Sequence, residues 1–239
     1  GDFYVLINQL NLMISHTEST DLLDASTKNY YLGEAYGLRA YVYFHLLRSW
    51  GDVVLQLDYT NGNSIDIGNP SKAASSAADV MTQIKKDIQS SEDAFGDDYS
   101  FKYGKCYWSK AATMMLKGEV YLWSGKQMNG GESDYTTAKN ALMAVKTAGV
   151  GLLNDFKKVF AYDNKENDEI IFAIHNGRNE YSLWNDQYRS TMVMNQANFG
   201  TYYDENGALL NETEMADMSG LIRYQVEQDL YTQLFREGD

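Results

Sequence analysis

The most regular pattern of apolar residues in the chain lies between residues 28 and 50. Apolar side chains recur there at steps of three and four residues on two sides of a helix. One side runs through Ala35, Val42 and Leu46, and the other through Tyr43 and Leu47. A helix that is apolar on two sides must be covered on both. The pattern therefore predicts a helix inside a stack of helices, and Gly51 is placed to end it.

The same periodicity predicts five further helices, over residues 2–15, 76–95, 107–125, 134–149 and 219–236. Ser133 or Asp134 is a suitable N-cap for the helix that starts at residue 134. We predict two antiparallel helix pairs, one over residues 107–149 and the other, with a longer loop, over residues 28–95. Repeated pairs of this kind resemble tetratricopeptide-type (TPR-like) stacking.

The pattern changes after residue 150. Residues 169–174 have the length and the β-branched content of a strand. Residues 176–220 lack helical periodicity and are rich in Asn, Gly, Tyr and Met. We therefore predict a mostly α protein with little β. It consists of a helical-pair scaffold over 1–150 and a loop-rich ligand-binding part over 151–239, which carries the short strand and the terminal helix.

Charge and composition exclude several classes of function. The net charge is −13, from 33 acidic and 20 basic residues, and this field repels phosphate backbones. We therefore expect no nucleic-acid partner. Cys106 is the one cysteine, which excludes an internal disulfide framework. The three histidines lie far apart without the spacing of a metal site, so we expect neither a metal nor a cofactor.

Candidate catalytic groups are few. The acidic residues fall mainly into runs such as 163–169, where a solvated loop is favoured over a calcium site because ordered ligand spacing is lacking. A glycosidase would need two carboxyl groups fixed across one bond, and we predict that the protein is not an enzyme. Arg39 lies on the long helix, where a structural ion pair with Glu119 or Glu34 is predicted.

The series of motifs resembles the SusD/RagB-like family, the glycan-binding outer-membrane lipoproteins that partner TonB-dependent transporters. Its strongest block is residues 31–44 (YLGEAYGLRAYVYF), followed by Trp50-Gly-Asp-Val53. Weaker blocks follow in the family's order over residues 80–88, 109–122, 134–145 and 156–172. The sequence departs from the family at Val54, where proline is usual. The resemblance covers roughly residues 1–175.

This resemblance implies a function and a location. The implied function is non-catalytic capture of an oligosaccharide at the cell surface and its delivery to a TonB-dependent, SusC-like transporter. The implied location is the outer membrane, as a surface-exposed lipoprotein whose lipid anchor is not present in this chain. A signal peptide, an anchor cysteine and a further C-terminal portion are expected outside the chain as well. Two alternatives stay open: a peptide-binding RagB-like homologue, and a TPR-type protein–protein adaptor.

The predicted ligand-binding residues lie in the irregular region. Sugars are held by flat apolar rings against their C–H faces, while amides and charged groups bind their hydroxyls. Residues 176–203 combine both kinds of group. The candidates are Arg178, Asn179, Tyr181, Trp184, Asn185, Tyr188, Arg189 and Tyr202. The alternative interpretation is an ordinary loop whose aromatic residues only fix it to the helices.

Overall fold

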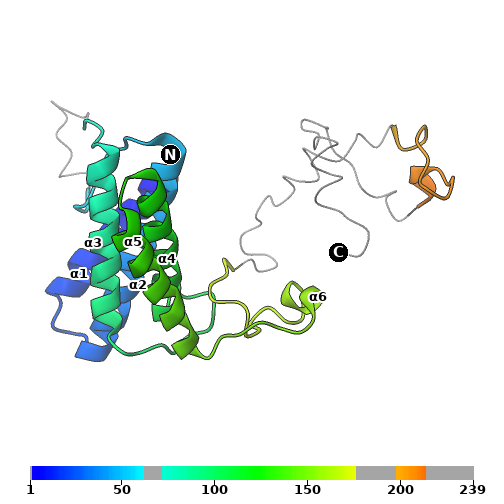
Figure 1. Cartoon of the computed structure of the whole chain (residues 1–239). Coiled ribbons are helices and arrows are strands. Elements are labelled where there is room, and N and C mark those ends of the chain that lie inside the picture. The colour runs from blue at the N-terminus through cyan, green and yellow to red at the C-terminus, as the bar shows by residue number, and fades with distance from the viewer. Residues whose placement is uncertain (1, 62–71, 176–197, 214–239) are drawn as a thin grey trace. The chain divides into compact units, whose positions relative to one another are not determined.

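The computed structural model describes residues 2–61, 72–175 and 198–213 (Figure 1). The chain divides into two compact units, residues 1–175 and residues 176–239. The predicted functional division at residue 150, between scaffold and ligand-binding part, stays a prediction.

Long helices that stand side by side build most of the first unit (Figure 1). They are α1 (Asp2–Ser19), α2 (Ala25–Trp50), α3 (Ala77–Phe95), α4 (Lys110–Gln127) and α5 (Gly131–Ala144). A 3-10 turn, η1 (Val145–Ala148), and a short helix, α6 (Phe156–Val159), follow. Each long helix packs against the next one in the chain. The predicted stack of antiparallel helix pairs is therefore confirmed.

Polar side chains define where the helices begin. The Asp24 carboxylate accepts a hydrogen bond from the backbone N–H of Thr27, and Ser109 accepts one from that of Ala112. These bonds satisfy donors that the first turn of a helix leaves without partners. Helix α5 differs from the prediction, because it starts at Gly131 and neither Ser133 nor Asp134 caps it. Asp134 lies in its first turn, where a negative charge is favourable.

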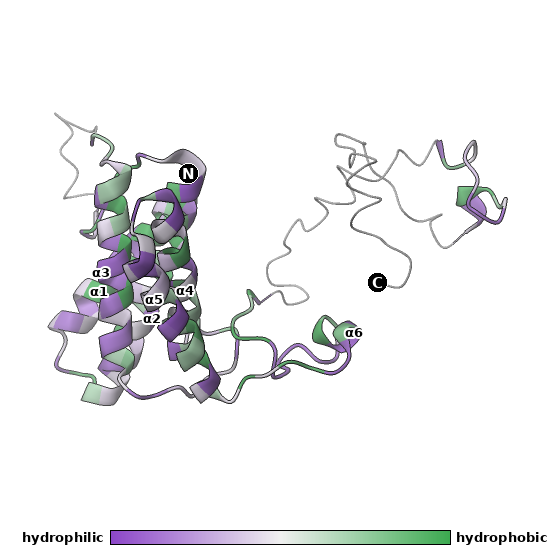
Figure 2. Cartoon of the chain, in the orientation of Figure 1, coloured by the Kyte–Doolittle hydropathy of each residue, from purple (hydrophilic) through white to green (hydrophobic). Residues whose placement is uncertain are grey.

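Helix α2 is covered on two sides, as its pattern predicts. Leu10 and Ile14 of α1 form one buried cluster with Ala35. Tyr43 and Phe44 belong to a second, larger core to which α3 and α4 also contribute. Figure 2 shows apolar and polar residues alternating around the helices, as expected for elements with one buried and one solvent-facing side. The helix ends at Gly51, whose φ of +73° suits glycine.

The buried ion pair of α2 has a different partner from the predicted ones. Arg39 is paired with Asp87 of α3, and neither Glu119 nor Glu34 contacts it. Glu119 is paired with Arg48 instead. Glu34 accepts a hydrogen bond of 3.2 Å from the backbone N–H of Trp108. The structural role predicted for Arg39 is confirmed, and the predicted partners are wrong.

Side chains of α1 and α2 hold the extended segment 54–60 against the bundle. The Tyr4 hydroxyl donates to the carbonyl of residue 54 at 2.9 Å, and the Asn11 amide donates to that of residue 56 at 2.9 Å. Tyr43 both donates to and accepts from the backbone of residue 56. Asn8 accepts from the N–H of residue 60 at 2.8 Å. These side-chain bonds satisfy backbone groups of the segment that would be paired with a neighbouring strand in a sheet.

The strand predicted over residues 169–174 is absent, and the described part of the chain contains only isolated β-bridges. The N–H of Ala173 donates to the carbonyl of Lys105 at 2.9 Å, without a continuing ladder. Ile171 and Phe172 pack against the helical core. Their apolar surface is therefore buried on helices, and the prediction of a strand is wrong. The predicted helix over 219–236 lies outside the described residues.

Candidate functional site

Most of the predicted ligand-binding residues fall outside the described part of the chain. This holds for Arg178, Asn179, Tyr181, Trp184, Asn185, Tyr188 and Arg189. Tyr202 is described, and 53% of it is exposed; the neighbouring Tyr203 is 66% exposed. The structure therefore presents two tyrosine side chains to solvent at the end of the candidate region. Their role in binding stays a prediction.

A tight turn holds these two tyrosines in place. The N–H of Leu210 donates to the carbonyl of Tyr202 at 3.0 Å, and residues 203 and 209 form an isolated bridge. The Asp204 carboxylate accepts from the N–H groups of Ala208 and Asn206, at 2.8 and 2.9 Å. Hydrogen bonds to a charged carboxylate favour its ionised form, so the pKa of Asp204 is lowered. A 3-10 turn, η3 (Leu210–Glu212), follows.

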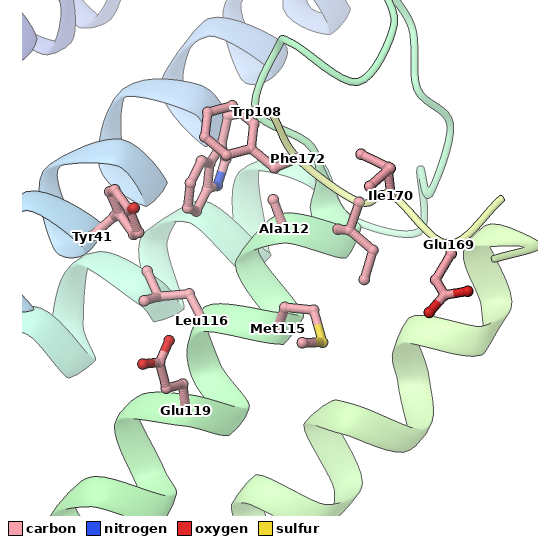
Figure 3. A pocket seen from close by; sticks show the side chains of 10 residues that line it. Tyr41, Trp108, Ala112, Met115, Leu116, Glu119, Glu169, Ile170 and Phe172 are labelled. Carbon is pink, nitrogen blue, oxygen red and sulfur yellow. The ribbon is translucent and has the colours of Figure 1, made fainter. Parts of the chain in front are cut away.

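The first unit contains an aromatic hollow of about 310 Å³, formed by α2, α4 and residues 169–172 (Figure 3). The rings of Tyr41, Trp108 and Phe172 line it, and the Met115 side chain lines it as well. Ring centroids are 5.1 Å apart for Trp108 and Phe172, and 5.7 Å apart for Trp108 and Tyr41. Contacts at these distances are typical of edge-to-face and tilted aromatic pairs.

Trp108 is fixed by its own hydrogen bonds. Its indole N–H donates to the Thr113 hydroxyl at 2.9 Å, and only 3% of the residue is exposed. Trp108 was not among the binding residues predicted from the sequence. The aromatic run Tyr103–Trp108, directly before the cap at Ser109, was the available signal. Trp108 is thus a buried wall of the hollow, and Tyr41 and Phe172 are its half-buried neighbours.

Two carboxylates lie on different sides of the hollow (Figure 3), and both already have partners. Glu119 accepts from Arg48 at 2.6 Å. Glu169 accepts from the backbone N–H of Leu153 at 2.9 Å. Acid–base cleavage of a sugar bond needs one carboxyl kept protonated and a second one across the bond. This hollow can bind apolar surface, and its carboxylates serve the fold.

Burial affects one acidic group next to this hollow. Burial raises the pKa of Glu34, while hydrogen bonds from Tyr30 and from the backbone N–H of Trp108 act in the opposite direction. The same surroundings raise the pKa of the Tyr30 hydroxyl, first through burial and then through the charge of Glu34. Glu34 therefore links α2 to the backbone that carries Trp108.

The described residues contain neither a candidate metal cluster nor a candidate membrane-spanning helix. That part of the chain contains no cluster of three or more His, Cys, Asp or Glu residues able to hold a metal ion. His45 lies edge-on to the Tyr41 ring, at 4.5 Å between centroids. The sulfur of Cys106 is 4.0 Å from the Nδ1 atom of His175. The described helices include none with the length and apolarity needed to cross a membrane.

Residues 2–122 match the SusD-like family described as starch-binding and associating with the outer membrane. A SusD-like protein of Bacteroides ovatus is 26% identical over 226 residues, which cover 90% of this chain and 40% of the relative. The structure of B. fragilis NanU is 57% identical, with a TM-score of 0.86, covering 99% of this chain and 47% of that chain.

A structure solved with xylogluco-oligosaccharide is 27% identical, with a TM-score of 0.61, over 72% of this chain and 34% of that chain. This chain thus spans less than half the length of each of these three proteins. The family match begins in α1 and continues into α4, so it contains the three helices that surround the Arg39–Asp87 pair. The chain belongs to the SusD-like family.

Proposed function

We propose that this protein captures an oligosaccharide at the cell surface, without cleaving it, and delivers it to a TonB-dependent, SusC-like transporter. The observation that carries this proposal is the family match over residues 2–122. The related structure that holds a xylogluco-oligosaccharide supports a glycan as the ligand. The full polypeptide would be a surface-exposed lipoprotein of the outer membrane.

The proposed ligand contacts are the aromatic and amide residues of the region 176–203. Trp184, Tyr188 and Tyr202 would cover the C–H faces of sugar rings, while Asn179 and Arg189 would bind hydroxyl groups. The exposure of Tyr202 and Tyr203 on their turn supports this assignment. Each contact would be weak, and several sugar units bound together would supply the affinity.

The proposed mechanism involves no bond chemistry. The helical bundle is a rigid support, because its buried side chains are fixed by paired hydrogen bonds and close packing. The protein would act as a lid on the transporter, opening to load the ligand and closing to deliver it. The engagement of Glu119 and Glu169 by other groups supports a binding role over a hydrolytic one.

Affinity gel electrophoresis tests glycan capture. The whole chain is run in gels that contain starch or xyloglucan, beside the double variant Trp184→Ala/Tyr188→Ala. We expect the wild type to be retarded and the variant to lose most of this retardation. The matched control is Trp50→Ala/Tyr162→Ala, which removes two exposed rings of the first unit, 63% and 85% exposed, and should leave retardation unchanged.

Two outcomes contradict the proposal. Equal retardation of the wild type and the Trp184→Ala/Tyr188→Ala variant would exclude these rings as the contact. Binding of peptides in place of every saccharide would favour the RagB-like alternative. The transporter step needs its own assay, in which the tagged full-length lipoprotein is purified from detergent-solubilised outer membranes. We expect a SusC-like transporter in stoichiometric amount, and a lipoprotein recovered alone would contradict delivery.

A further inference from the structure

A second pocket lies where α2 begins and α3 ends. Its volume is about 250 Å³. Tyr30 and Phe95 form its apolar wall, with ring centroids 5.9 Å apart, and Ser26, Asn29, Asp98 and Lys102 supply polar groups around it. The pocket therefore combines rings with hydrogen-bonding groups, whereas the first hollow is mainly apolar.

Two exposed tyrosines extend the aromatic wall. Tyr103 stands edge-on to Tyr30 at 5.3 Å, and Tyr107 follows at 5.5 Å from Tyr103. About half of each of these side chains is open to solvent, 51% for Tyr103 and 50% for Tyr107. The Tyr30 hydroxyl is engaged with Glu34, so this residue offers its ring and not its hydroxyl. The row of three rings continues from the pocket onto the surface.

The polar groups of the pocket are available to a ligand. Among the described residues, the side chains of Ser26 and Asn29 have no hydrogen-bond partner. The ammonium of Lys102 lies 4.9 Å from the centroid of the Tyr30 ring. Unlike Lys85 and Lys117, Lys102 forms no salt bridge with the described residues. The Asp98 carboxylate accepts hydrogen bonds from Ser100, among them one from its N–H at 2.9 Å, and keeps further acceptor capacity.

We propose that this pocket, with Tyr103 beside it, binds one neutral sugar unit of a glycan, as a contact separate from the region 176–203. The inference rests on the proposed function, because it takes a glycan as the ligand. A sugar ring needs a flat apolar surface for its C–H face, and the aromatic rings supply it. Its hydroxyl groups need both donors and acceptors, which the pocket supplies as an amide, a hydroxyl, a carboxylate and an ammonium.

Size and charge narrow the class of ligand. A volume of about 250 Å³ is below the usual range for drug-sized ligands, roughly 300–1,000 Å³, so it fits a single ring better than an oligosaccharide. The lining carries one carboxylate, Asp98, and one ammonium, Lys102. A lining without net charge suits a neutral sugar.

Lysine acetylation read by mass spectrometry tests the pocket directly, since Lys102 lines it. The whole chain is acetylated under limiting conditions with and without maltoheptaose or a xylogluco-oligosaccharide, and exposed Lys146 serves as the internal control. At a saccharide concentration of about ten times Kd, we expect Lys102 to react about tenfold more slowly while Lys146 is unchanged.

Two variants test whether the saccharide protects Lys102 by binding in this pocket. Asn29→Ala removes a side chain without a protein partner, so the fold should be unaffected; it should weaken saccharide protection of Lys102 about fivefold. Tyr103→Ala should weaken it about three- to tenfold, with circular dichroism used to verify its fold. Tyr162→Ala, which removes an exposed tyrosine elsewhere in the unit, should leave the protection as in the wild type.

The outcomes separate this inference from the proposed function. If gels retard the chain while Lys102 reacts at its original rate, the pocket is excluded and glycan capture stands. Protection that persists in Asn29→Ala and Tyr103→Ala also excludes it. Protection by trigalacturonate and not by the neutral saccharides would overturn the assigned class. If no saccharide retards the chain, the proposed function fails, and this inference fails with it.

Discussion

The guanidinium of Arg39 and the carboxylate of Asp87 meet through two hydrogen bonds of 2.8 Å each, with both side chains almost completely buried. Asn11 of α1 accepts a further bond from Arg39, and Gln83 donates one to Asp87, also at 2.8 Å each. The pair therefore joins α1, α2 and α3 at one point. Charge-assisted bonds in this forked geometry are strong and directional.

Removing the charge of Asp87 should lower the free energy of unfolding of the bundle. Asp87→Asn leaves the buried Arg39 guanidinium without a counter-charge, which we expect to cost about 3–5 kcal/mol of the free energy of unfolding. Guanidinium chloride unfolding followed by circular dichroism measures this loss. The double variant Arg39→Met/Asp87→Leu should recover most of the loss, because apolar groups replace the buried charges.

The control for this prediction is the exposed pair of Arg48 and Glu119, in which Glu119 is 53% exposed at its side chain. Glu119→Gln should cost less than about 1 kcal/mol. Equal losses for Asp87→Asn and Glu119→Gln would show that burial does not determine the contribution of the Arg39 pair.

A methyl group at residue 37 should disturb the wall of the aromatic hollow. A Cβ atom at Gly37 would collide with the indole of Trp108. Gly37→Ala is therefore expected to destabilise the protein by about 1–3 kcal/mol and to shift the tryptophan fluorescence. Gly151→Ala is the matched control, because no atom lies within 4 Å of its Cβ position. An unchanged unfolding curve for Gly37→Ala would contradict the observed packing.

Glu34 should make the protein less stable as the pH rises. Burial raises the pKa of Glu34 in the folded chain above its unfolded value. The folded state then binds this proton more tightly, so the contribution is fully present below the unfolded pKa and is lost as the pH rises through the folded pKa. Glu34→Gln keeps an acceptor for Tyr30 and Trp108 and removes the titration.

Thermal unfolding at several pH values between about 4 and 8 tests this prediction. The melting temperature of Glu34→Gln should rise relative to the wild type as the pH increases. Comparison with the variant is necessary because Asp24, Asp98 and Asp204 have lowered pKa values and contribute with the opposite sign. A constant difference between wild type and Glu34→Gln would contradict it.

The helices could be predicted from local pattern, because burial on one or two sides imposes its period on the sequence. Helix α2 was predicted over 28–50 and spans Ala25–Trp50. Partners far apart in the chain could not be predicted in this way. Asp87 is 48 residues from Arg39, and the period places it on α3 without indicating which cation it meets.

Two errors have a common cause. The run 169–174 has the composition of a strand, yet its Ile171 and Phe172 side chains pack against helices. Trp108 was not assigned to a site, because its environment is formed by Tyr41 and Phe172 from distant segments. Composition identified residues 176–203 as candidates for binding, but the geometry of a site depends on contacts that a periodic pattern does not contain.

The most direct test of glycan capture is a calorimetric titration of the whole chain with maltoheptaose and with a xylogluco-oligosaccharide, followed by chromatography of the recovered sugar. We predict saturable binding of at least one of them, with the saccharide recovered intact after prolonged incubation. Absence of saturable binding to every saccharide tested, or recovery of shortened products, would contradict capture without cleavage.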